Sequence, residues 1–390
     1  MNNPNPDNHH EDDEQGDVFL NEEDIINEVE VDEEDLPDAD EEENTEEIDD
    51  SMHTFTGHTD EVYTVACSPT DPTLVATGGK DDKGFLWRIG VGDWFSELKG
   101  HEDTVYSLAF SADGQLLASG GYDNIVQIWD AASGNLRCKL DGPGGGIEWV
   151  KWHPKGHLLL AGSEDCTVWM WNADKNVLLH TFSGHAGTVV CGDFTPDGKT
   201  ICTGSDDATL RVWNPKSGEN IHAVRGHPYH TEPITCLALS SDSTLAITGS
   251  SDGSVHIVNI TTGKVVSSLL SHTDSVECVG FAPSSPWVAT GSLDGNLIIW
   301  DLKHSMPRST CGHEEEGVTC LAWLGSSRYV ASGCTGGKIR IWDSLSGYCV
   351  KVFSGHSDNI QSLTVSANQD FLVSVSIDNT ARVFEIAEFK

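Results

Sequence analysis

Short runs of apolar residues alternate with turn-forming Asp and Gly residues along most of this chain. In the first clear unit, apolar residues gather at 62–67, 74–78 and 84–87, and polar turn residues separate them. Runs of this length and punctuation predict β-strands. The unit then repeats, and its last apolar position recurs every 42 residues except for one step of 45. That position holds Trp87, Trp129, Trp171, Trp213, Val258, Trp300, Trp342 and Phe384.

The repeat period predicts the architecture. Gly-His stands upstream in most units, as at Gly57-His58, and Trp-Asp downstream, as at Trp300-Asp301. A period in the low forties with these dipeptides resembles the WD40 family, in which each unit is a four-stranded propeller blade. One blade cannot bury its sheet faces alone, so neighbouring blades supply each other's core. The sequence therefore predicts an all-β, eight-bladed WD40 β-propeller preceded by a disordered acidic N-terminal tail.

The chain divides into two parts. Residues 1–50 are acidic and of low complexity, which predicts a disordered tail, and residues 51–390 contain the propeller. Residues 52–56 precede the first Gly-His without a blade of their own, so we expect them to complete the eighth blade and close the ring. An apolar island interrupts the tail; it is either a short motif that folds on a partner or on the propeller, or a set of incidental apolar residues. The island comprises Val18, Phe19, Leu20, Ile25, Ile26, Val29 and Val31.

A His, a Ser or Thr, an Asp and a Trp recur in fixed order in four units. Their order suits a buried relay in which Asp accepts from His, His meets the hydroxyl and the hydroxyl meets the indole N–H. Ser, His and Asp also form the nucleophilic triads of some enzymes. Four copies that follow the repeat period favour a structural role for these residues over a catalytic one. The four tetrads are His58, Thr77, Asp81, Trp87; His101, Ser119, Asp123, Trp129; His185, Thr203, Asp207, Trp213; and His272, Thr290, Asp294, Trp300.

Other units depart from the tetrad. Blade three has a Gly-Pro-Gly-Gly-Gly run at 142–146 in place of Gly-His, and Ala161 in place of the hydroxyl. Blade seven has Gly336 in place of Asp. In blade five, the spacing to the Trp position selects His230 over His227 as the structural histidine. We expect such blades to be places of partner contact or local mobility.

The charge of the chain limits the classes of partner that it is expected to bind. The formal net charge is −40, and residues 1–50 hold 24 of the 62 acidic residues and none of the 22 basic ones. An acidic chain argues against nucleic acid and anionic membrane and favours basic partners. The eleven cysteines form no metal-binding cluster, so we expect no metal or cofactor and a reducing compartment. Neither a secretory signal nor a membrane span is visible. We expect a cytoplasmic monomer, with the nucleus as a second compartment.

Two positions per blade are expected to project from the face that carries the His and Asp turns. In the first four blades these positions, with Glu61, collect four acids and three tyrosines against Lys80. Carboxylates beside exposed aromatic rings suit Lys- or Arg-rich peptides; the alternative is the ordinary polar surface of an acidic protein. The predicted partner-binding residues are Glu61, Tyr63, Tyr106, Tyr122, Glu148, Glu164, Asp206 and Glu277.

Four stretches resemble the angio-associated migratory cell protein family, namely 78–87, 148–154, 159–171 and 24–30. This resemblance implies a dedicated chaperone. The fungal family member captures the basic N-terminal segment of a newly made large-subunit ribosomal protein of the universal L-sixteen type, and the animal member is associated with cell migration and signalling. The leading hypothesis is therefore a non-catalytic protein that captures a basic ribosomal protein segment during ribosome biogenesis.

Two other classes of function stay open. Residues 300–303 (Trp-Asp-Leu-Lys) and 213–216 (Trp-Asn-Pro-Lys) loosely resemble the Trp-Asp-x-Arg box that docks substrate receptors on cullin-type ubiquitin ligases, with Lys in place of Arg. A general signalling scaffold is the other class, and the sequence offers no discriminating feature for it. An enzyme is disfavoured, since no phosphate loop, metal cluster or unique triad is present.

Overall fold

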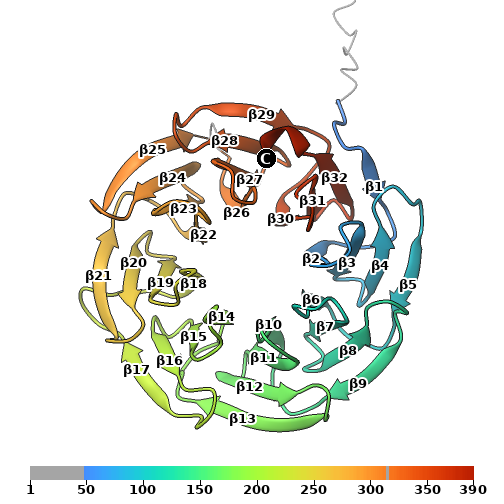
Figure 1. Ribbon diagram of the computed structural model, residues 1–390, viewed down its shortest axis with the longest axis horizontal. Coiled ribbons are helices and arrows are strands. Elements are labelled where there is room, and N and C mark those ends of the chain that lie inside the picture. The colour runs from blue at the N-terminus through green and yellow to red at the C-terminus, as the bar shows by residue number, and fades with distance from the viewer. Residues whose placement is uncertain (1–47, 313–315) are drawn as a thin grey trace, which may run out of the picture. The chain divides into compact units, whose positions relative to one another are not determined.

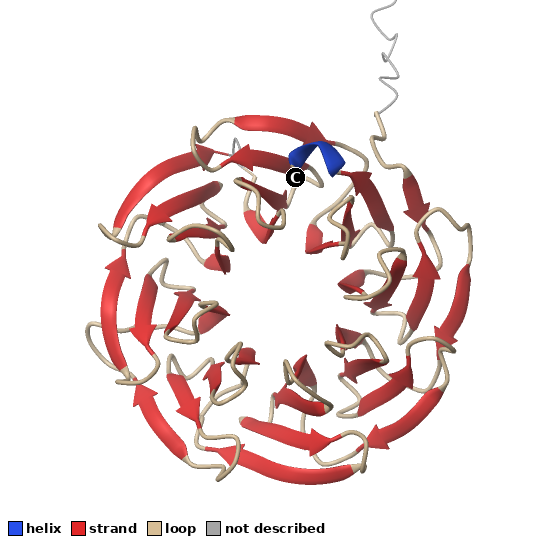
Figure 2. Cartoon of the chain, in the orientation of Figure 1, coloured by secondary structure: helices blue, strands red, loops and turns tan. Residues whose placement is uncertain are grey.

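The computed structural model describes residues 48–312 and 316–390, so residues 1–47 of the predicted tail lie outside the described residues. In the described chain, strands β1 to β32 form eight antiparallel sheets of four strands each. The sheets stand around a central opening, with the first strand of most sheets beside it and the last at the rim (Figures 1 and 2). The predicted all-β, eight-bladed propeller is confirmed.

Blades one to four each contain four consecutive strands. Blade one comprises β2 (Val62–Cys67), β3 (Leu74–Gly79), β4 (Gly84–Arg88) and β5 (Trp94–Leu98). Blade two comprises β6 (Val105–Phe110), β7 (Leu116–Gly121), β8 (Val126–Asp130) and β9 (Leu136–Leu140). Blade three comprises β10 (Ile147–Trp152), β11 (Leu158–Ser163), β12 (Thr167–Asn172) and β13 (Val177–Ser183). Blade four comprises β14 (Cys191–Phe194), β15 (Ile201–Gly204), β16 (Leu210–Trp213) and β17 (Asn220–Val224).

Blades five to seven repeat this order, and blade eight borrows its outer strand from the start of the propeller. Blade five comprises β18 (Ile234–Leu239), β19 (Leu245–Ser250), β20 (Val255–Asn259) and β21 (Lys264–Leu269). Blade six comprises β22 (Val276–Phe281), β23 (Trp287–Ser292), β24 (Asn296–Asp301) and β25 (Met306–Gly312). Blade seven comprises β26 (Val318–Trp323), β27 (Tyr329–Cys334), β28 (Ile339–Asp343) and β29 (Cys349–Phe353). Blade eight comprises β30 (Ile360–Val365), β31 (Phe371–Ser376), β32 (Ala381–Glu385) and β1 (His53–Phe55).

Strand direction divides the turns between two faces of the ring. Neighbouring strands of a blade are antiparallel. The turn that leads into the inner strand and the turn between the second and third strands of the same blade therefore lie on one face of the ring. We call this the histidine-turn face, since it carries the tetrad histidines and aspartates, as in residues 57–61 and 80–83 of blade one. The opposite face carries the remaining turns and the 3-10 helix η2 (Ala387–Phe389), which lies in front in Figure 1.

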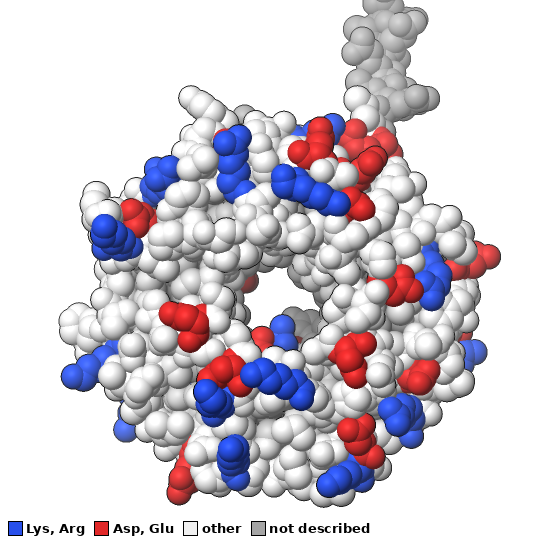
Figure 3. All heavy atoms as spheres, viewed as in Figure 1, with Lys and Arg blue, Asp and Glu red and all other residues white. Residues whose placement is uncertain are grey.

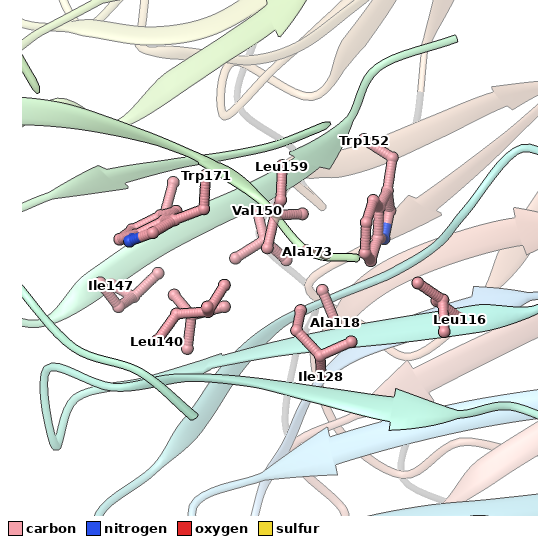
Figure 4. Packing of buried hydrophobic residues seen from close by; sticks show 12 residues of the cluster. Leu116, Ala118, Ile128, Leu140, Ile147, Val150, Trp152, Leu159, Trp171 and Ala173 are labelled. Atoms are coloured by element: carbon pink, nitrogen blue, oxygen red, sulfur yellow. The ribbon is translucent and has the colours of Figure 1, made fainter. Parts of the chain in front are cut away.

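Apolar residues from adjacent blades form the core between the sheets. In one such cluster, Ile128 and Leu140 of blade two face Ile147, Val150 and Trp171 of blade three, and all five are buried (Figure 4). At roughly 1.5–3 kcal/mol for each large apolar side chain, burial of this kind stabilises the pairing of blades. A single blade would leave these faces in water. The ring therefore depends on every blade having two neighbours.

The two ends of the ring meet in one sheet. Strand β1 pairs antiparallel with β32, and Phe55 lies opposite Ala381. The ring of Phe55 also stacks on Trp87 of blade one, with 4.9 Å between ring centroids. Just before β1, Asp49 forms an ion pair with Arg382. The outer strand of blade eight is thus held by hydrogen bonds on one side and by a buried aromatic contact with the first blade on the other.

The four tetrads are assembled in the predicted order. The histidine Nδ1 lies 2.9–3.1 Å from the Asp carboxylate, and Nε2 lies 2.7–3.0 Å from the hydroxyl. Each indole Nε1 donates to the same hydroxyl at 2.8–3.3 Å. The hydroxyls are buried, so removing one partner costs about 1–3 kcal/mol for the group left unpaired. The tetrads tie the histidine turn to the middle of each sheet.

Blade five lacks the Trp of the tetrad, and a residue outside the repeat spacing replaces its indole. Val258 stands at the Trp position, and Tyr229 fills the space, only 3% exposed. The Tyr229 hydroxyl lies 2.9 Å from Thr248 Oγ1, which His230 Nε2 also approaches to 2.8 Å. His230 is therefore the structural histidine, as predicted. A tyrosine hydroxyl from the histidine turn takes over the hydrogen bond that an indole makes in other blades.

Blade seven uses an ion pair where the tetrad Asp is absent. Arg340 Nη1 donates to Glu316 Oε2 at 2.8 Å, beside Gly336. Trp342 Nε1 still donates to Ser332 at 2.8 Å. Elsewhere, all eleven cysteines are free thiols. Across 48–312 and 316–390, no helix is long and apolar enough to cross a membrane, and no group of three His, Cys, Asp or Glu side chains could hold a metal ion.

Candidate peptide-binding face

β-Bulges determine which side chains project from the histidine-turn face. In blade one, the register shifts between Val62 and Thr64, so Tyr63 is the extra residue of the inner strand. Such a bulge bends the strand and re-aims the side chain. Seven inner strands have this shift at the same position. The bulged residues are Tyr63, Tyr106, Glu148, Thr235, Glu277, Thr319 and Gln361.

Three tyrosines from two blades lie in one row, which we call the tyrosine stack. The Tyr63 and Tyr106 ring centroids lie 5.6 Å apart with their planes tilted by 49°, and Tyr106 and Tyr122 are stacked at 5.0 Å. The sequence argument expected exposed aromatic faces, but all three side chains are half-buried because they cover one another. Tyr106 is enclosed on both sides, so the outer rings of the stack, Tyr63 and Tyr122, offer the faces for a cation.

The stack leads to a group of carboxylates. The Tyr122 hydroxyl lies 3.5 Å from Glu148 Oε1. Burial, followed by the charges of Glu164 and Asp206, raises the pKa of Glu148 to about 7. Burial, followed by the charge of Glu148, raises the pKa of the Tyr122 hydroxyl, so it stays a neutral donor. None of the ion pairs in the described ranges includes Glu148, Glu164 or Asp206. We call these three the carboxylate cluster.

The glycine run of blade three, residues 142–146, lets the Tyr122 ring and the Glu164 carboxylate lie close to the backbone. Gly146 N–H donates to Glu164 Oε2 at 2.9 Å and so orients that carboxylate. A Cβ on Gly146 would lie 2.6 Å from the Tyr122 ring and 2.8 Å from Glu164 Oε2. Both distances are shorter than a carbon side chain tolerates. The departure of blade three from the Gly-His pattern therefore has a steric role at the candidate site.

Glu61 and Glu277, also predicted for this face, make their hydrogen bonds outside the carboxylate cluster, although burial and then the charges of Glu148 and Glu277 raise the pKa of Tyr106. Glu61 accepts hydrogen bonds from Tyr63 and from Lys80 Nζ, the latter at 3.0 Å. Because Lys80 compensates its charge, Glu61 contributes less to the negative potential than the sequence suggested. Glu277 belongs to blade six and accepts a hydrogen bond from Ser275 at 2.6 Å. The predicted residues therefore comprise the tyrosine stack, the carboxylate cluster and two further acids, of which Glu61 is paired with Lys80.

The charge on the opposite face is mixed. In the view of Figure 3, Lys and Arg side chains are interspersed with Asp and Glu around the central opening. Lys151 and Asp193 of adjacent blades, for example, lie 4.0 Å apart. The two turns that loosely resemble a ubiquitin-ligase docking box follow third strands, so they belong to this face as well. A mixed surface of this kind offers weaker attraction to a basic chain than three unpaired carboxylates.

The repeat is matched along almost the whole described chain. The family model described as WD domain, G-beta repeat, matches eight segments: 49–88, 92–130, 134–172, 176–214, 218–259, 263–301, 305–343 and 347–385. The chain belongs to the WD40 repeat family. Members of this family are generally non-catalytic scaffolds.

Two relatives of this WD40 protein match it in sequence over a short stretch. The human angio-associated migratory cell protein is 45% identical over 65 residues, which is 17% of this chain and 15% of that protein. An uncharacterized WD repeat-containing protein of Schizosaccharomyces pombe is 37% identical over 67 residues, 17% of each chain. These matches span about a sixth of the relatives' length. They indicate partial homology.

Solved structures match the propeller over much more of its length. Sqt1 of Chaetomium thermophilum, in a crystal structure bound to the N-terminus of the ribosomal protein L10, has a TM-score of 0.81 at 24% identity. The match covers 87% of this chain and 100% of that one. Sqt1 of Saccharomyces cerevisiae has a TM-score of 0.79 at 21% identity, covering 87% and 99%. At these identities the likeness shows a shared fold.

Proposed function

We propose that this WD40 propeller is a dedicated chaperone for a basic segment of a newly made large-subunit ribosomal protein. The observation that carries the proposal is the carboxylate cluster of Glu148, Glu164 and Asp206 at the end of the tyrosine stack. The negative charges of Glu164 and Asp206 help raise the pKa of Glu148. A Lys or Arg side chain would supply the missing positive charge and gain charge-assisted hydrogen bonds.

The tyrosines add a second kind of contact. A guanidinium or ammonium group beside the carboxylate cluster also meets the ring of Tyr122, and cation–π attraction contributes about 0.5–2 kcal/mol depending on desolvation. A half-buried, stacked ring loses little conformational freedom when a ligand binds. The face is therefore preorganised for an extended chain that places basic side chains along it.

A relative of the same fold supports this choice of partner. The Chaetomium thermophilum Sqt1 structure contains the N-terminus of a ribosomal protein, L10. Ribosomal proteins are basic and stick to RNA, so an acidic propeller would speed their capture and shield them until assembly. The proposed role requires the protein in the cytoplasm, where ribosomal proteins are made, and in the nucleus, where subunits assemble.

The test is binding of a fluorescent peptide from the N-terminus of that ribosomal protein, measured by anisotropy. We expect Glu148→Lys plus Glu277→Lys to weaken binding at least about tenfold, equivalent to about 1.4 kcal/mol. The matched control reverses two exposed acids of the opposite face, Glu385→Lys plus Glu388→Lys, and should bind like the wild type. Equal affinity of all three proteins would contradict the proposed site. Binding should also weaken as salt is raised.

A further inference from the structure

A cleft of about 420 Å³ lies between blades five and six on the opposite face. Its walls come from the turns after β18, β22 and β24 and from the strand ends beside them, in two neighbouring blades (Figure 1). Leu245, Phe281 and Leu302 form its apolar part. These three side chains pack against the buried core of the two blades, yet each is only half-buried. The cleft therefore has fixed apolar walls that are open to solvent.

Two exposed charges of opposite sign border the cleft. Asp242 and Lys303 both line it, and neither forms an ion pair within residues 48–312 and 316–390. Ser240 Oγ donates to Asp242 Oδ1 at 2.6 Å, and Thr244 N–H and Oγ1 donate to the same oxygen at 3.1 and 2.8 Å. The hydrogen bonds from Ser240 and Thr244 lower the pKa of Asp242, so it stays ionised. Its second oxygen, Oδ2, accepts no hydrogen bond from a described residue.

The boundary between blades two and three shows how the same positions act when a third side chain joins them. There, His157 lies between two carboxylates, with Nε2 3.0 Å from Asp113 Oδ2 and Nδ1 2.8 Å from Asp174 Oδ1. Counted from the strand ends, the corresponding positions of blades five and six are Asp242 for Asp113, Pro286 for His157 and Lys303 for Asp174. A proline side chain has no donor or acceptor. Blades five and six therefore keep the two outer positions but lack the side chain that bridges them.

We propose that this cleft binds an extended peptide segment of a second partner protein, with one apolar side chain in the cleft, a basic residue at Asp242 and an acidic residue at Lys303. The partner's charges would form charge-assisted hydrogen bonds with Asp242 Oδ2 and Lys303 Nζ. The open walls favour a side chain of a bound peptide over a free small molecule, since small-molecule sites enclose most of the ligand surface. A purely basic segment would be repelled by Lys303, so this partner differs in class from that of the histidine-turn face. This inference does not depend on the proposed function.

Selection of random peptides displayed on phage, with the full-length protein as the target, tests the proposal. We expect the wild type to select a family in which an apolar residue stands between a basic and an acidic one. Ser285→Trp fills the cleft with a large side chain, and Lys303→Glu reverses one of its charges. Both should weaken binding of the selected peptides at least about tenfold, measured by fluorescence anisotropy. The matched control, Lys199→Glu, makes the same charge change in the turn after β14, on the same face, and should bind like the wild type.

Selection on the Lys303→Glu protein should yield a second family, with a basic residue in place of the acidic one, a change that loss of folding could not produce. The proposal is overturned if no selected family has the expected pattern, or if the peptides bind the Ser285→Trp protein as tightly as the wild type. Displacement of the peptides by free leucine would overturn it too, because it would assign the cleft to a small molecule. So would a wild-type dimer that Ser285→Trp dissociates, since a second copy of the chain would then occupy the cleft.

Discussion

Replacing Glu148 by Gln should remove most of the pH dependence of basic-peptide binding between pH 6 and 8. In the free protein, burial and the charges of Glu164 and Asp206 raise the pKa of Glu148 to about 7. A bound Lys or Arg favours the carboxylate, so binding displaces a proton. The ionised fraction of a group with that pKa rises from about 9% at pH 6 to about 91% at pH 8, which corresponds to about tenfold in affinity or 1.4 kcal/mol.

Folding stability provides a second readout with the opposite sign. The native state holds a proton on Glu148 that the unfolded chain releases above the ordinary pKa of 4.5. Its contribution to stability is therefore complete below pH 4.5 and is lost as the pH rises towards 7. Glu148→Gln should flatten that part of the curve of unfolding free energy against pH, as measured by urea denaturation.

Affinity is best measured by fluorescence anisotropy with a histidine-free basic peptide at constant ionic strength. Glu277→Gln is the charge-matched control; it should weaken binding while keeping the wild-type slope against pH. The reasoning is refuted if the wild type binds equally well at pH 6 and pH 8. It is also refuted if the Glu148→Gln protein retains the full tenfold dependence.

Three further substitutions test the site and the ring. Gly146→Ala should weaken peptide binding several-fold, since its Cβ would collide with the ring and carboxylate beside it, whereas Gly144→Ala, whose Cβ meets its nearest atom at 3.8 Å, should not; anisotropy with both variants decides. Tyr229→Phe should cost about 1 kcal/mol of unfolding free energy by removing one buried hydrogen bond, and an unchanged urea midpoint would speak against its tetrad role. Phe55→Ala should cost about 3–5 kcal/mol by opening a cavity against Trp87, measured by urea denaturation, and a loss below 1 kcal/mol would show that ring closure does not depend on that contact.

The fold and the tetrads were predictable because both follow from the spacing of residues along the chain. The number of repeats of about 42 residues gives the number of blades. The fixed intervals between His, hydroxyl, Asp and Trp indicate which side chains contact one another. Tyr229 was missed because it lies in the three-residue insertion of blade five, outside the periodic register. A tyrosine in the histidine turn of a blade that lacks its Trp was the available signal.

The candidate site was predictable in its residues but not in its contacts. Counting along each inner strand identified Tyr63, Tyr106 and Glu148, and the bulges explain why that position projects. Spacing within one blade cannot show that the rings of Tyr63 and Tyr106, from neighbouring blades, lie beside each other, or that Lys80 turns towards Glu61. Such contacts depend on rotamers and on the angle between blades, which the repeat leaves unspecified.

The pairing of β1 with β32 sets an order of events during synthesis. Residues 53–55 are among the first of the propeller to leave the ribosome, yet their partners at 381–383 are translated more than 300 residues later. Until then the first and last blades lack a neighbour, and a nascent chain exposes apolar sheet faces at both ends. Folding of this protein can therefore finish only after translation has passed residue 385, and a chain stopped short of that point is a target for aggregation or proteolysis.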